Sequence, residues 1–463
     1  MDNSPFSKEL PNPHKTSLVL SFCLISCIFI YLVFSRNFIF GSKAGKWVYP
    51  FFSDIAPIPV WIPIVVFLLL GVLVIWGSKH IYRHEIATLI IGVLIAITIQ
   101  ILINSIYHFP LSEIVRSDTA NSFYTPAQKY SPVEILSSYQ TLAPSLPLHA
   151  RTNLPGKILF FQFLGIFTSS PRLMAYLIIS ISTLGGCLLY EICRILFNNK
   201  MIAYNAFILY VLIPCKQYFF PILNTVTPVF ILLSMLLLLL FINSKKKLFL
   251  VLLGVSLYLL VLFEPSPLTT GIIFVGILLN AIGNKRISSK DLSSVFLLSI
   301  LSFAAMYFIF RFIFSFDLLR AFDYVLKDAV QFNVQAKREY WIWIGGNIKE
   351  FFWGAGLPVM MIFIYFATSV ITQWLDDKTN ILHLSSDSLY VICLLLTFII
   401  VLFWGINRGE ITRLWIYLAV FFQIPAAIFL DKIIKSPSLF FILAAIMVCQ
   451  SMIGLQKVTF VAP

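Results

Sequence analysis

The sequence predicts an all-α polytopic membrane protein with about 13 transmembrane helices. Three observations predict this class. Hydrophobic residues make up 59% of the 463 residues and charged residues only 11%, about half the charged share of soluble domains. Apolar runs of about twenty residues, the length that crosses a bilayer, recur along the whole chain. The ten-residue alternating pattern of transmembrane β-barrels does not recur, which excludes that class.

The apolar runs are separated by short polar breaks. The predicted spans begin near Thr16, Pro59, Ile86, Arg172, Met201, Thr225, Leu248, Leu268, Val295, Trp353, Ser388, Ile411 and Pro437. The seven cysteines fall in or beside these runs, without the spacing of a metal site or of a disulfide framework. At the inner end of the fourth span, Glu191 is expected to pair with Arg194 three residues later.

Positive charge sets the predicted orientation. The net charge is +13, but the Lys and Arg residues cluster beside the spans, as topology and anionic headgroups require, so the bilayer and not nucleic acid is the predicted partner. With a cytoplasmic N-terminus in the inner (plasma) membrane, the loops that share the cytoplasmic side carry Lys79 and Arg83, Arg194 and Lys200, Lys245 to Lys247, Lys285 to Lys290, and Lys432 and Lys435. Arg36, Lys43 and Lys46, in the first external loop, run against this rule.

Three segments are expected along the chain. Residues 1–104 form the N-terminal transmembrane helices, including two additional spans, and residues 105–171 form an external loop with juxtamembrane helices. Residues 172–463 form a transmembrane bundle with an external loop at 315–352. Within that loop, Leu318–Phe332 has apolar residues at helical spacing, which predicts an amphipathic helix on the membrane surface.

The polar stretch from Ser105 to Pro155 is where we expect chemistry, because a protein that only spans lipid has no use for it. Asp118, between small residues in this stretch, is the favoured catalytic acid. The alternative is a solvated loop acid, or the N-cap of a helix that contains Phe123. The rival acids of the external loops are Glu113, Glu134 and Asp54.

A series of motifs follows Asp118 in a fixed order. Tyr124 and Ala127 come first, then the run Arg151-Thr152-Asn153-Leu154-Pro155-Gly156, a helix Lys157–Thr168, and a span that ends in Cys193-Arg194-Ile195-Leu196-Phe197. This order resembles the GT-C glycosyltransferases, integral membrane enzymes with an acid in the first large external loop, a His-Pro-Pro-Gly-like run and a basic end to the next span. In this chain Leu154-Pro155 replaces the paired prolines, Asn153 stands at the usual His, and His149 lies four residues earlier.

Two later stretches extend the resemblance over most of residues 118–430. The run from Tyr340 to Pro358 is similar to a late external loop of bacterial members, and Gly409 to Trp415 is similar to the Arg-bearing start of one of their late spans. The fold that the resemblance implies is GT-C-like, with about 13 spans and external juxtamembrane helices. The resemblance is to bacterial enzymes of the dolichyl-phosphate-mannose-protein mannosyltransferase type.

The resemblance implies an inverting transfer of a sugar from a polyprenyl-phosphate donor to a lipid, glycan or protein acceptor on the extracytoplasmic face. Asp118 would be the base, because the attacking hydroxyl must lose its proton, and Arg413 would contact the leaving phosphate. The further residues expected to contact substrate are Arg408, Arg151, His149, Tyr124, Lys349 and Glu264. No metal site and no cofactor is firmly implied by the sequence, and dependence on a divalent metal stays open.

Alternatives remain open for the arginine and for the whole protein. An unpaired guanidinium at the start of an apolar span suggests a bound anion, but Arg413 could also be an interfacial anchor or pair with Glu410. A polysaccharide polymerase or ligase would use a diphosphate-linked glycan and need no early-loop acid. A multi-pass transporter or flippase would place polar groups in mid-membrane.

Overall fold

A computed structural model describes residues 12–377 and 385–463, so the first eleven residues of the predicted segment 1–104 lie outside it. The protein is an all-α polytopic membrane protein, as the sequence predicts. The helices that run between its two ends are α1 (Asn12–Phe34), α2 (Trp61–Gly71) continued by η1 (Val72–Trp76) and α3 (Gly77–His80), α4 (Glu85–Asn104), α11 (Pro171–Phe197), α12 (Lys200–Val211), α14 (Thr227–Ser244), α15 (Leu248–Phe263), α16 (Gly271–Gly283), α17 (Ser289–Ile313), α20 (Leu357–Asp377), α21 (Ser386–Trp404), α23 (Ile416–Phe429) continued by η6 (Leu430–Ile434), and α24 (Pro437–Lys457).

Each predicted span corresponds to one of these helices. Within the described residues, eleven helical segments are long and apolar enough to cross a membrane. The other two predicted spans are α12, with 12 residues, and α15, with 16 residues. At 1.5 Å per residue these two helices are about 18 and 24 Å long, shorter than the hydrocarbon core of a bilayer.

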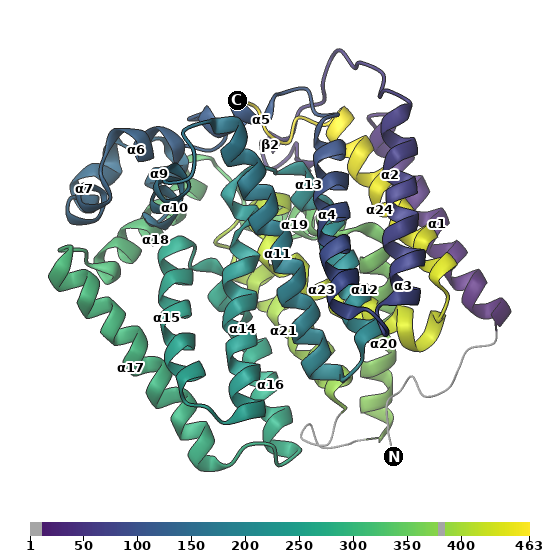
Figure 1. Cartoon of the computed structure of the whole chain (residues 1–463). Helices are drawn as coiled ribbons and strands as arrows, with labels where there is room; N and C mark the ends of the chain where they lie inside the picture. Colours follow the sequence, from purple (N-terminus) through teal and green to yellow (C-terminus); the bar gives the residue numbers. More distant parts are fainter. Residues whose placement is uncertain (1–11, 378–384) are drawn as a thin grey trace.

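Successive helices alternate in direction, so the loops collect at two ends (Figure 1). We call one end the basic face: it carries the loops at 81–84, 198–199, 245–247, 284–288 and 435–436, and α1 begins there. The opposite end, the loop face, carries the loops at 35–60, 105–170, 314–356 and 405–415. The chain ends on the loop face, beside α5 and β2 (Figure 1). The clusters of Lys and Arg that set the predicted orientation therefore share one end.

The loop face is built from short elements. They are β1 (Gly41–Ser42), β2 (Trp47–Val48), α5 (Leu111–Arg116), α6 (Tyr124–Lys129), α7 (Pro132–Ser137), α8 (Tyr139–Leu142), η2 (Ala143–Ser145), α9 (Leu148–Arg151), α10 (Gly156–Gly165), η4 (Ser266–Thr270), α18 (Leu318–Gln335), α19 (Tyr340–Ala355) and α22 (Ile411–Leu414). The helix predicted at 157–168 is α10 and ends three residues earlier, while the predicted amphipathic helix is α18 and extends to Gln335. One stripe of α18 is exposed, with Leu319 and Val334 on it, and the opposite stripe is buried, with Ala321 and Val325.

The interior contains an irregular segment that the hydropathy pattern does not reveal. After α12 the chain forms α13 (Pro214–Tyr218) and η3 (Leu223–Thr225), and every residue from 202 to 228 is buried. Backbone polar groups inside a bilayer need partners, and side chains of a neighbouring helix and of the segment itself supply them here. Ser182 Oγ on α11 donates to the Thr225 carbonyl oxygen at 2.6 Å, and Gln217 Nε2 donates to the Val211 carbonyl oxygen at 3.0 Å. This segment brings Asn224 beneath the loop face.

Candidate functional site

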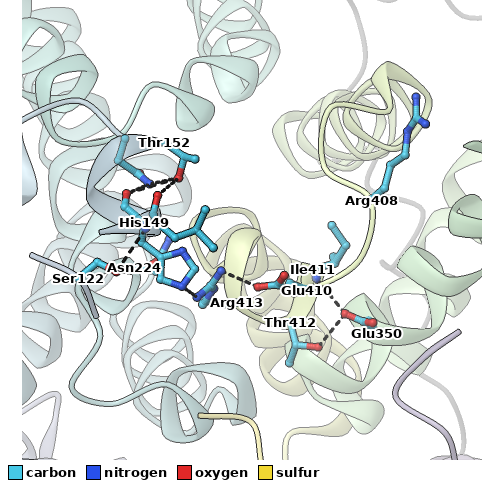
Figure 2. A network of polar contacts seen from close by, with 12 residues as sticks. Ser122, His149, Thr152, Asn224, Glu350, Arg408, Glu410, Ile411, Thr412 and Arg413 are labelled. Carbon is cyan, nitrogen blue, oxygen red and sulfur yellow. Dashed lines mark hydrogen bonds and ion pairs between the residues drawn. The ribbon is translucent and has the colours of Figure 1, made fainter. Parts of the chain in front are cut away.

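A chain of polar contacts joins α9 to α22 on the loop face. Arg413 Nη1 lies 3.1 Å from His149 Nε2, and Arg413 Nη2 donates to Glu410 Oε2 at 2.5 Å (Figure 2). Glu410 Oε1 in turn accepts from Arg338 Nη2 at 3.1 Å. The side chains of Arg338 and Arg413 are only 6% and 13% exposed. The early and late external loops therefore meet at one buried cluster, Arg338–Glu410–Arg413–His149, which we call the arginine cluster.

The hydrogen bond fixes the tautomer of His149. A guanidinium can only donate, so Nε2 must be the unprotonated acceptor and the ring proton sits on Nδ1. The main-chain group of Thr119 lies close enough to the ring to raise its pKa. Burial, together with the charge of Arg413, lowers the pKa of His149 to about 3, so the ring is neutral at physiological pH. His149 thus links Arg413 to the loop of Asp118, because the His149 amide donates to Ser122 Oγ at 3.3 Å.

The charges of the arginine cluster do not cancel. Two guanidinium groups share the single carboxylate of Glu410, which leaves one positive charge because His149 is neutral. Burial raises the pKa of Glu410, but Arg413 and Arg338 outweigh this effect and the pKa lies below its usual value. The Nε atoms of Arg413 and Arg338 are buried and have no hydrogen-bond partner among the described residues. The cluster can therefore offer donors and charge to an anion.

A second buried cluster lies beside the first, and we call it the lysine–glutamate cluster. Lys157 Nζ on α10 lies 3.0 Å from Glu264 Oε2, with the two side chains 2% and 6% exposed. The Glu264 carboxylate also accepts from Thr227 Oγ1 at 2.6 Å, from Asn224 Nδ2 at 3.2 Å and from Ser266 Oγ at 3.1 Å. These bonds compensate a charge pair that would otherwise be costly to bury.

Asn153 joins the two clusters. Its side-chain oxygen accepts from Lys157 Nζ at 3.2 Å, and its side-chain nitrogen donates to the His149 carbonyl oxygen at 2.8 Å. Burial lowers the pKa of Lys157, while Glu264 opposes that effect. The residue that replaces the usual His of the resembled motif is therefore a structural link between α9 and α10.

The carboxylate of Glu350 accepts hydrogen bonds from the first residues of α22. The Ile411 amide donates to Glu350 Oε2 at 2.9 Å, and the Thr412 hydroxyl lies 3.4 Å from the same oxygen (Figure 2). Burial raises the pKa of Glu350 to about 7, against the lowering effect of the main-chain hydrogen bonds from Thr412 and Ile411. Glu350 Oε1 and the buried Tyr49 hydroxyl lack hydrogen-bond partners among the described residues. Glu350 is thus a buried acid that titrates near neutral pH and holds the segment carrying Arg413.

Both loops of the site contain a non-glycine residue in left-handed backbone conformation. Ser122 has φ 63° and Glu410 has φ 59°, a conformation that costs energy and tends to occur at functional sites. Ser122 Oγ donates to the Asp118 carbonyl oxygen at 2.5 Å and accepts from the His149 amide at 3.3 Å. Next to Glu410, Gly409 has φ 83°, and a Cβ there would lie 2.7 Å from the Trp343 ring. The backbone of both loops is therefore fixed by specific contacts.

The structure places three predicted site residues together and Asp118 beside them. His149 and Arg413 are in contact, and Glu264 is linked to them through Lys157 and Asn153. Asp118 lies on the connection between α5 and α6, and its side chain is exposed. It does not cap α6, because the N-cap residue of that helix is Phe123. Of the rival acids, Glu134 completes a capping box with Ser131 at the start of α7.

The other predicted substrate contacts have partners elsewhere in the protein. Arg408 points away from Arg413 in Figure 2 and donates to the carbonyl oxygens of Gly405 and Arg338. Lys349 donates to the Gly41 carbonyl oxygen at 2.9 Å, and Arg151 Nε lies 3.7 Å from Asp328 Oδ1 on α18. The ring of Tyr124 packs edge-on against Phe161, with centroids 5.9 Å apart. Each of these four side chains has a structural role that sequence reasoning did not foresee.

Arg413 is an ion-paired residue, so the alternative that it pairs with Glu410 is what the structure shows. The alternative in which Arg413 is unpaired is therefore wrong. Glu410, the N-cap residue of α22, lies three residues before Arg413 and pairs with it. Sequence reasoning missed the partners Lys157, Arg338 and Glu350. The signal that could have found Lys157 is a single charge inside an otherwise apolar run, since such a charge needs a partner when it is buried.

No site for a metal ion follows from the described residues, which contain no group of three or more His, Cys, Asp or Glu side chains placed to hold one. An open cavity of about 500 Å³ lies on the loop face between α8 and α18 and is lined by Tyr139, Gln140, Leu319, Arg320, Asp323 and Tyr324. Asp118 and Arg413 do not line it. The candidate site is therefore defined by its two charge clusters and the Asp118 loop, and not by this cavity.

No family model, curated protein or solved structure matches the chain.

Proposed function

We propose that the protein is a membrane glycosyltransferase that moves a sugar from a polyprenyl-phosphate donor to a lipid, glycan or protein acceptor. The loop face would be the extracytoplasmic face, with the basic face in the cytoplasm of a cell whose inner (plasma) membrane holds the protein. The observation that carries the proposal is the uncompensated positive charge of the arginine cluster beside the loop of Asp118.

The reaction needs an anion site at the membrane surface, because the prenyl tail of the donor stays in lipid. The acceptor oxygen attacks the anomeric carbon, its proton passes to the Asp118 carboxylate, and the bond from that carbon to the phosphate oxygen breaks. The phosphate leaves with the bonding electrons and carries the additional negative charge. Arg413, with a free Nε–H group, would stabilise that charge.

The position of Asp118 suits a base for an acceptor that arrives from water. Its carboxylate is exposed, while its carbonyl oxygen accepts from Ser122 Oγ, which in turn accepts from the His149 amide. His149, neutral and fixed in one tautomer, would position Arg413 and would not itself take part as a base.

The experiment that tests the proposal is Asp118→Asn, with Glu113→Gln as the matched control. Glu113 is an exposed acid on α5 in the same loop. Surface glycolipids and glycans are compared by mass spectrometry in cells that express the wild type, either variant, or no protein. We expect Asp118→Asn to reduce product about 10²- to 10⁴-fold, the usual contribution of a general base, at wild-type protein levels. Glu113→Gln should leave product unchanged.

Two outcomes would overturn the proposal. If cells with and without the protein have the same glycolipids and glycans, the protein does not transfer a sugar. If Asp118→Asn retains full transfer, the base is another group, and a polymerase or ligase that needs no early-loop acid becomes the better explanation.

A second candidate function is transport, and one observation favours it. Lys216, in the buried irregular segment between α12 and α14, is fully buried, and its Nζ atom has no hydrogen-bond partner among the described residues. Broken helices and buried charged side chains at membrane depth mark the substrate paths of many transporters. Uptake of a lipid-linked or soluble sugar by vesicles that contain the purified protein, without formation of a new glycoside, would support this candidate.

A further inference from the structure

The open cavity between α8 and α18 has no part in the reaction proposed above. Its volume of about 500 Å³ lies within the roughly 300–1,000 Å³ of small-molecule sites. Tyr139 and Gln140 form its α8 side. Its α18 side is formed by residues about one helical turn apart, namely Leu319, Arg320, Asp323 and Tyr324. The cavity is therefore large enough for a small ligand and lies between two helices of the loop face.

The α8 side of the cavity is connected to the candidate site. Tyr139 is only 1% exposed, and its hydroxyl donates to the Asn153 carbonyl oxygen at 2.5 Å. Asn153 is the residue that joins the arginine cluster to the lysine–glutamate cluster. Nearby, Arg151 Nε on α9 lies 3.7 Å from Asp328 Oδ1 on α18, where the two helices come together (Figure 1). One side chain therefore links the cavity to the segment that contains both His149 and Asn153.

The exposed groups of the cavity combine hydrogen-bond donors and acceptors. The Gln140 side chain is exposed and carries both an amide N–H₂ group and a carbonyl oxygen. The side chains of Arg320 and Asp323 are 70% and 60% exposed and have opposite charges. Each also has an ion-pair partner, Asp317 for the arginine at 3.5 Å and Lys327 for the aspartate at 2.6 Å. The charges at this opening therefore balance, in contrast to those of the arginine cluster.

A neutral saccharide has the chemistry that this lining complements. Its hydroxyl groups both donate and accept hydrogen bonds, and planar amide, guanidinium and carboxylate groups can each bind two neighbouring hydroxyls. The C–H faces of its rings are apolar and pack on aromatic rings, and the half-buried Tyr324 supplies one at the cavity. The lining thus offers both kinds of contact that a sugar ring can make.

Other ligand classes fit this lining less well. A prenyl phosphate needs a net positive charge and an apolar channel, and the residues that line the cavity supply neither. A peptide usually adds to the edge of a sheet or lays an apolar face into a hydrophobic groove. Here both walls are helices, and Leu319 is the one aliphatic residue of the lining. A saccharide is therefore the ligand that the observations favour.

We propose that this cavity binds a neutral saccharide, and that this saccharide belongs to the acceptor of the transfer reaction. The second part rests on the proposed function, and it narrows the acceptor from a lipid, glycan or protein to a glycan. The first part does not depend on transfer, because binding of a saccharide can be measured in the absence of any donor.

The test measures binding of glycans to the purified full chain in a neutral detergent. The ligands are oligosaccharides released from the surface glycolipids and glycans of cells that lack the protein, because these cells retain the unmodified acceptor. The oligosaccharides are labelled with a fluorophore, separated by size and titrated by fluorescence polarisation. At least one fraction should bind saturably. Inorganic phosphate and farnesyl phosphate should not displace it, since the cavity carries no net charge.

Gln140→Ala and Gln128→Ala form a matched pair of variants. Both glutamines are exposed and lie on short helices of the same polar stretch, but Gln128, on α6, does not line the cavity. Gln140→Ala should weaken glycan binding about fivefold, the effect of one lost hydrogen bond, and Gln128→Ala should leave it within twofold. Circular dichroism and size-exclusion profiles show whether both variants fold. If Gln140→Ala does not, Asp323→Asn replaces it, with a loss of at least about fivefold expected.

Asp118→Asn separates this inference from the proposed function. The variant should lose transfer but keep the wild-type affinity for the glycan, because Asp118 does not line the cavity. If glycan binding depends on Gln140 while cells with and without the protein have the same glycans, the proposed function and the role of acceptor are overturned and the saccharide site stands.

Four results overturn the saccharide site itself. Absence of saturable binding by every glycan fraction excludes it. Equal weakening by Gln140→Ala and Gln128→Ala places the glycan outside the cavity. Displacement by inorganic phosphate means that the ligand is held as an anion. Displacement by tryptic peptides from envelope proteins of the same cells means that the cavity takes a peptide.

Discussion

The two ends of the molecule handle positive charge in opposite ways. On the loop face, the central cations Lys157, Arg338 and Arg413 are 2%, 6% and 13% exposed, and each shares a carboxylate with further hydrogen-bonding groups. On the basic face, the cations of the ion pairs remain partly in water: Arg194 is 43% and Lys245 41% exposed. If the charge of the basic face only sets the orientation in the membrane, as the sequence predicts, it requires no fixed geometry. The loop face fixes its charges in place, as expected where geometry matters.

The difference predicts where the loss of one ion-pair partner should most reduce the free energy of unfolding. A buried ion pair gives little net stability when intact, but removal of one partner leaves a charge without compensation. An exposed pair is screened by water and salt, so its loss changes the free energy of unfolding very little. Substitutions of equal chemistry should therefore have very different effects at the two ends, and the following experiments measure that contrast.

The largest effect is expected for Glu264→Ala. The change leaves the buried ammonium of Lys157 without its carboxylate and should lower the free energy of unfolding by about 3–5 kcal/mol. The measurement is a denaturant titration in detergent micelles, followed by tryptophan fluorescence. Replacing both partners, as in Lys157→Met with Glu264→Leu, should recover most of the loss, because two apolar groups need no compensation.

The matched control for Glu264→Ala is Asp323→Ala, which removes the partner of Lys327 on α18. In that pair the side chains are 74% and 60% exposed, and the expected change is within about 0.5 kcal/mol. Because α18 also lies on the loop face, the two variants separate burial from position in the molecule. If they lose similar stability, burial is not what distinguishes the two ion pairs.

Glu350→Gln should change how stability depends on pH. The folded-state pKa of Glu350, about 7, exceeds the ordinary value of 4.5 because of burial. The folded state therefore holds the proton more tightly than the unfolded state. This contribution is fully present below pH 4.5 and is lost as pH rises through 7, about 3 kcal/mol in all. The glutamine keeps an acceptor for the Ile411 amide but cannot ionise, so the variant should lose less stability between pH 5 and 8.

The thermal midpoint at several pH values measures this effect. Glu339→Gln is the control, because Glu339 is an exposed glutamate at the start of the same helix, α19. A wild-type slope that persists in Glu350→Gln would assign the pH dependence to other groups, of which Glu410 and Lys349 are the charged neighbours.

Most of the fold could be predicted from the sequence, because each span needs about twenty apolar residues and the loops between spans carry the polar ones. The irregular segment between α12 and α14 could not, since its prolines and polar residues mark only a break between two spans, and its packing against α24, α19, α11 and α4 is what buries it. The exposed position of Asp118 and the meeting of His149 with Arg413 follow from topology in outline, because their loops share one face.

The pairing of charges could not be predicted in the same way. Glu264 and Lys157 are distant in the chain, as are Glu410 and Arg338, and no local pattern joins them. Glu410 and Arg413 are three residues apart, so this pair was among the alternatives that the sequence offered. Local spacing thus reveals pairs within a helix, whereas pairs between loops depend on how the loops fold over the bundle.

Lys216→Met tests a buried lysine that has no carboxylate partner. Lys216 Nζ lies 3.7 Å from the centre of the Tyr210 ring, and the described residues provide it with no hydrogen bond. Methionine has a similar shape and no charge to desolvate, so we expect stability to stay equal or rise by about 1 kcal/mol. Lys157→Met should instead destabilise, because Glu264 would remain buried without its cation. A large loss in Lys216→Met would mean that a charged group or water compensates this lysine.

The smallest effect is expected on the basic face, for Glu191→Gln. Glu191 binds Arg194 through both carboxylate oxygens, at 2.7 and 2.6 Å, as its spacing in the sequence predicts. The geometry is bidentate, yet the side chains of Arg194 and Glu191 are 43% and 30% exposed, so water screens the pair and the expected loss is within about 0.5 kcal/mol. A loss above about 1 kcal/mol, measured beside Glu264→Ala in the same detergent titration, would show that good geometry can outweigh exposure. Burial would then no longer explain why removal of an ion-pair partner is expected to cost more stability on the loop face than on the basic face.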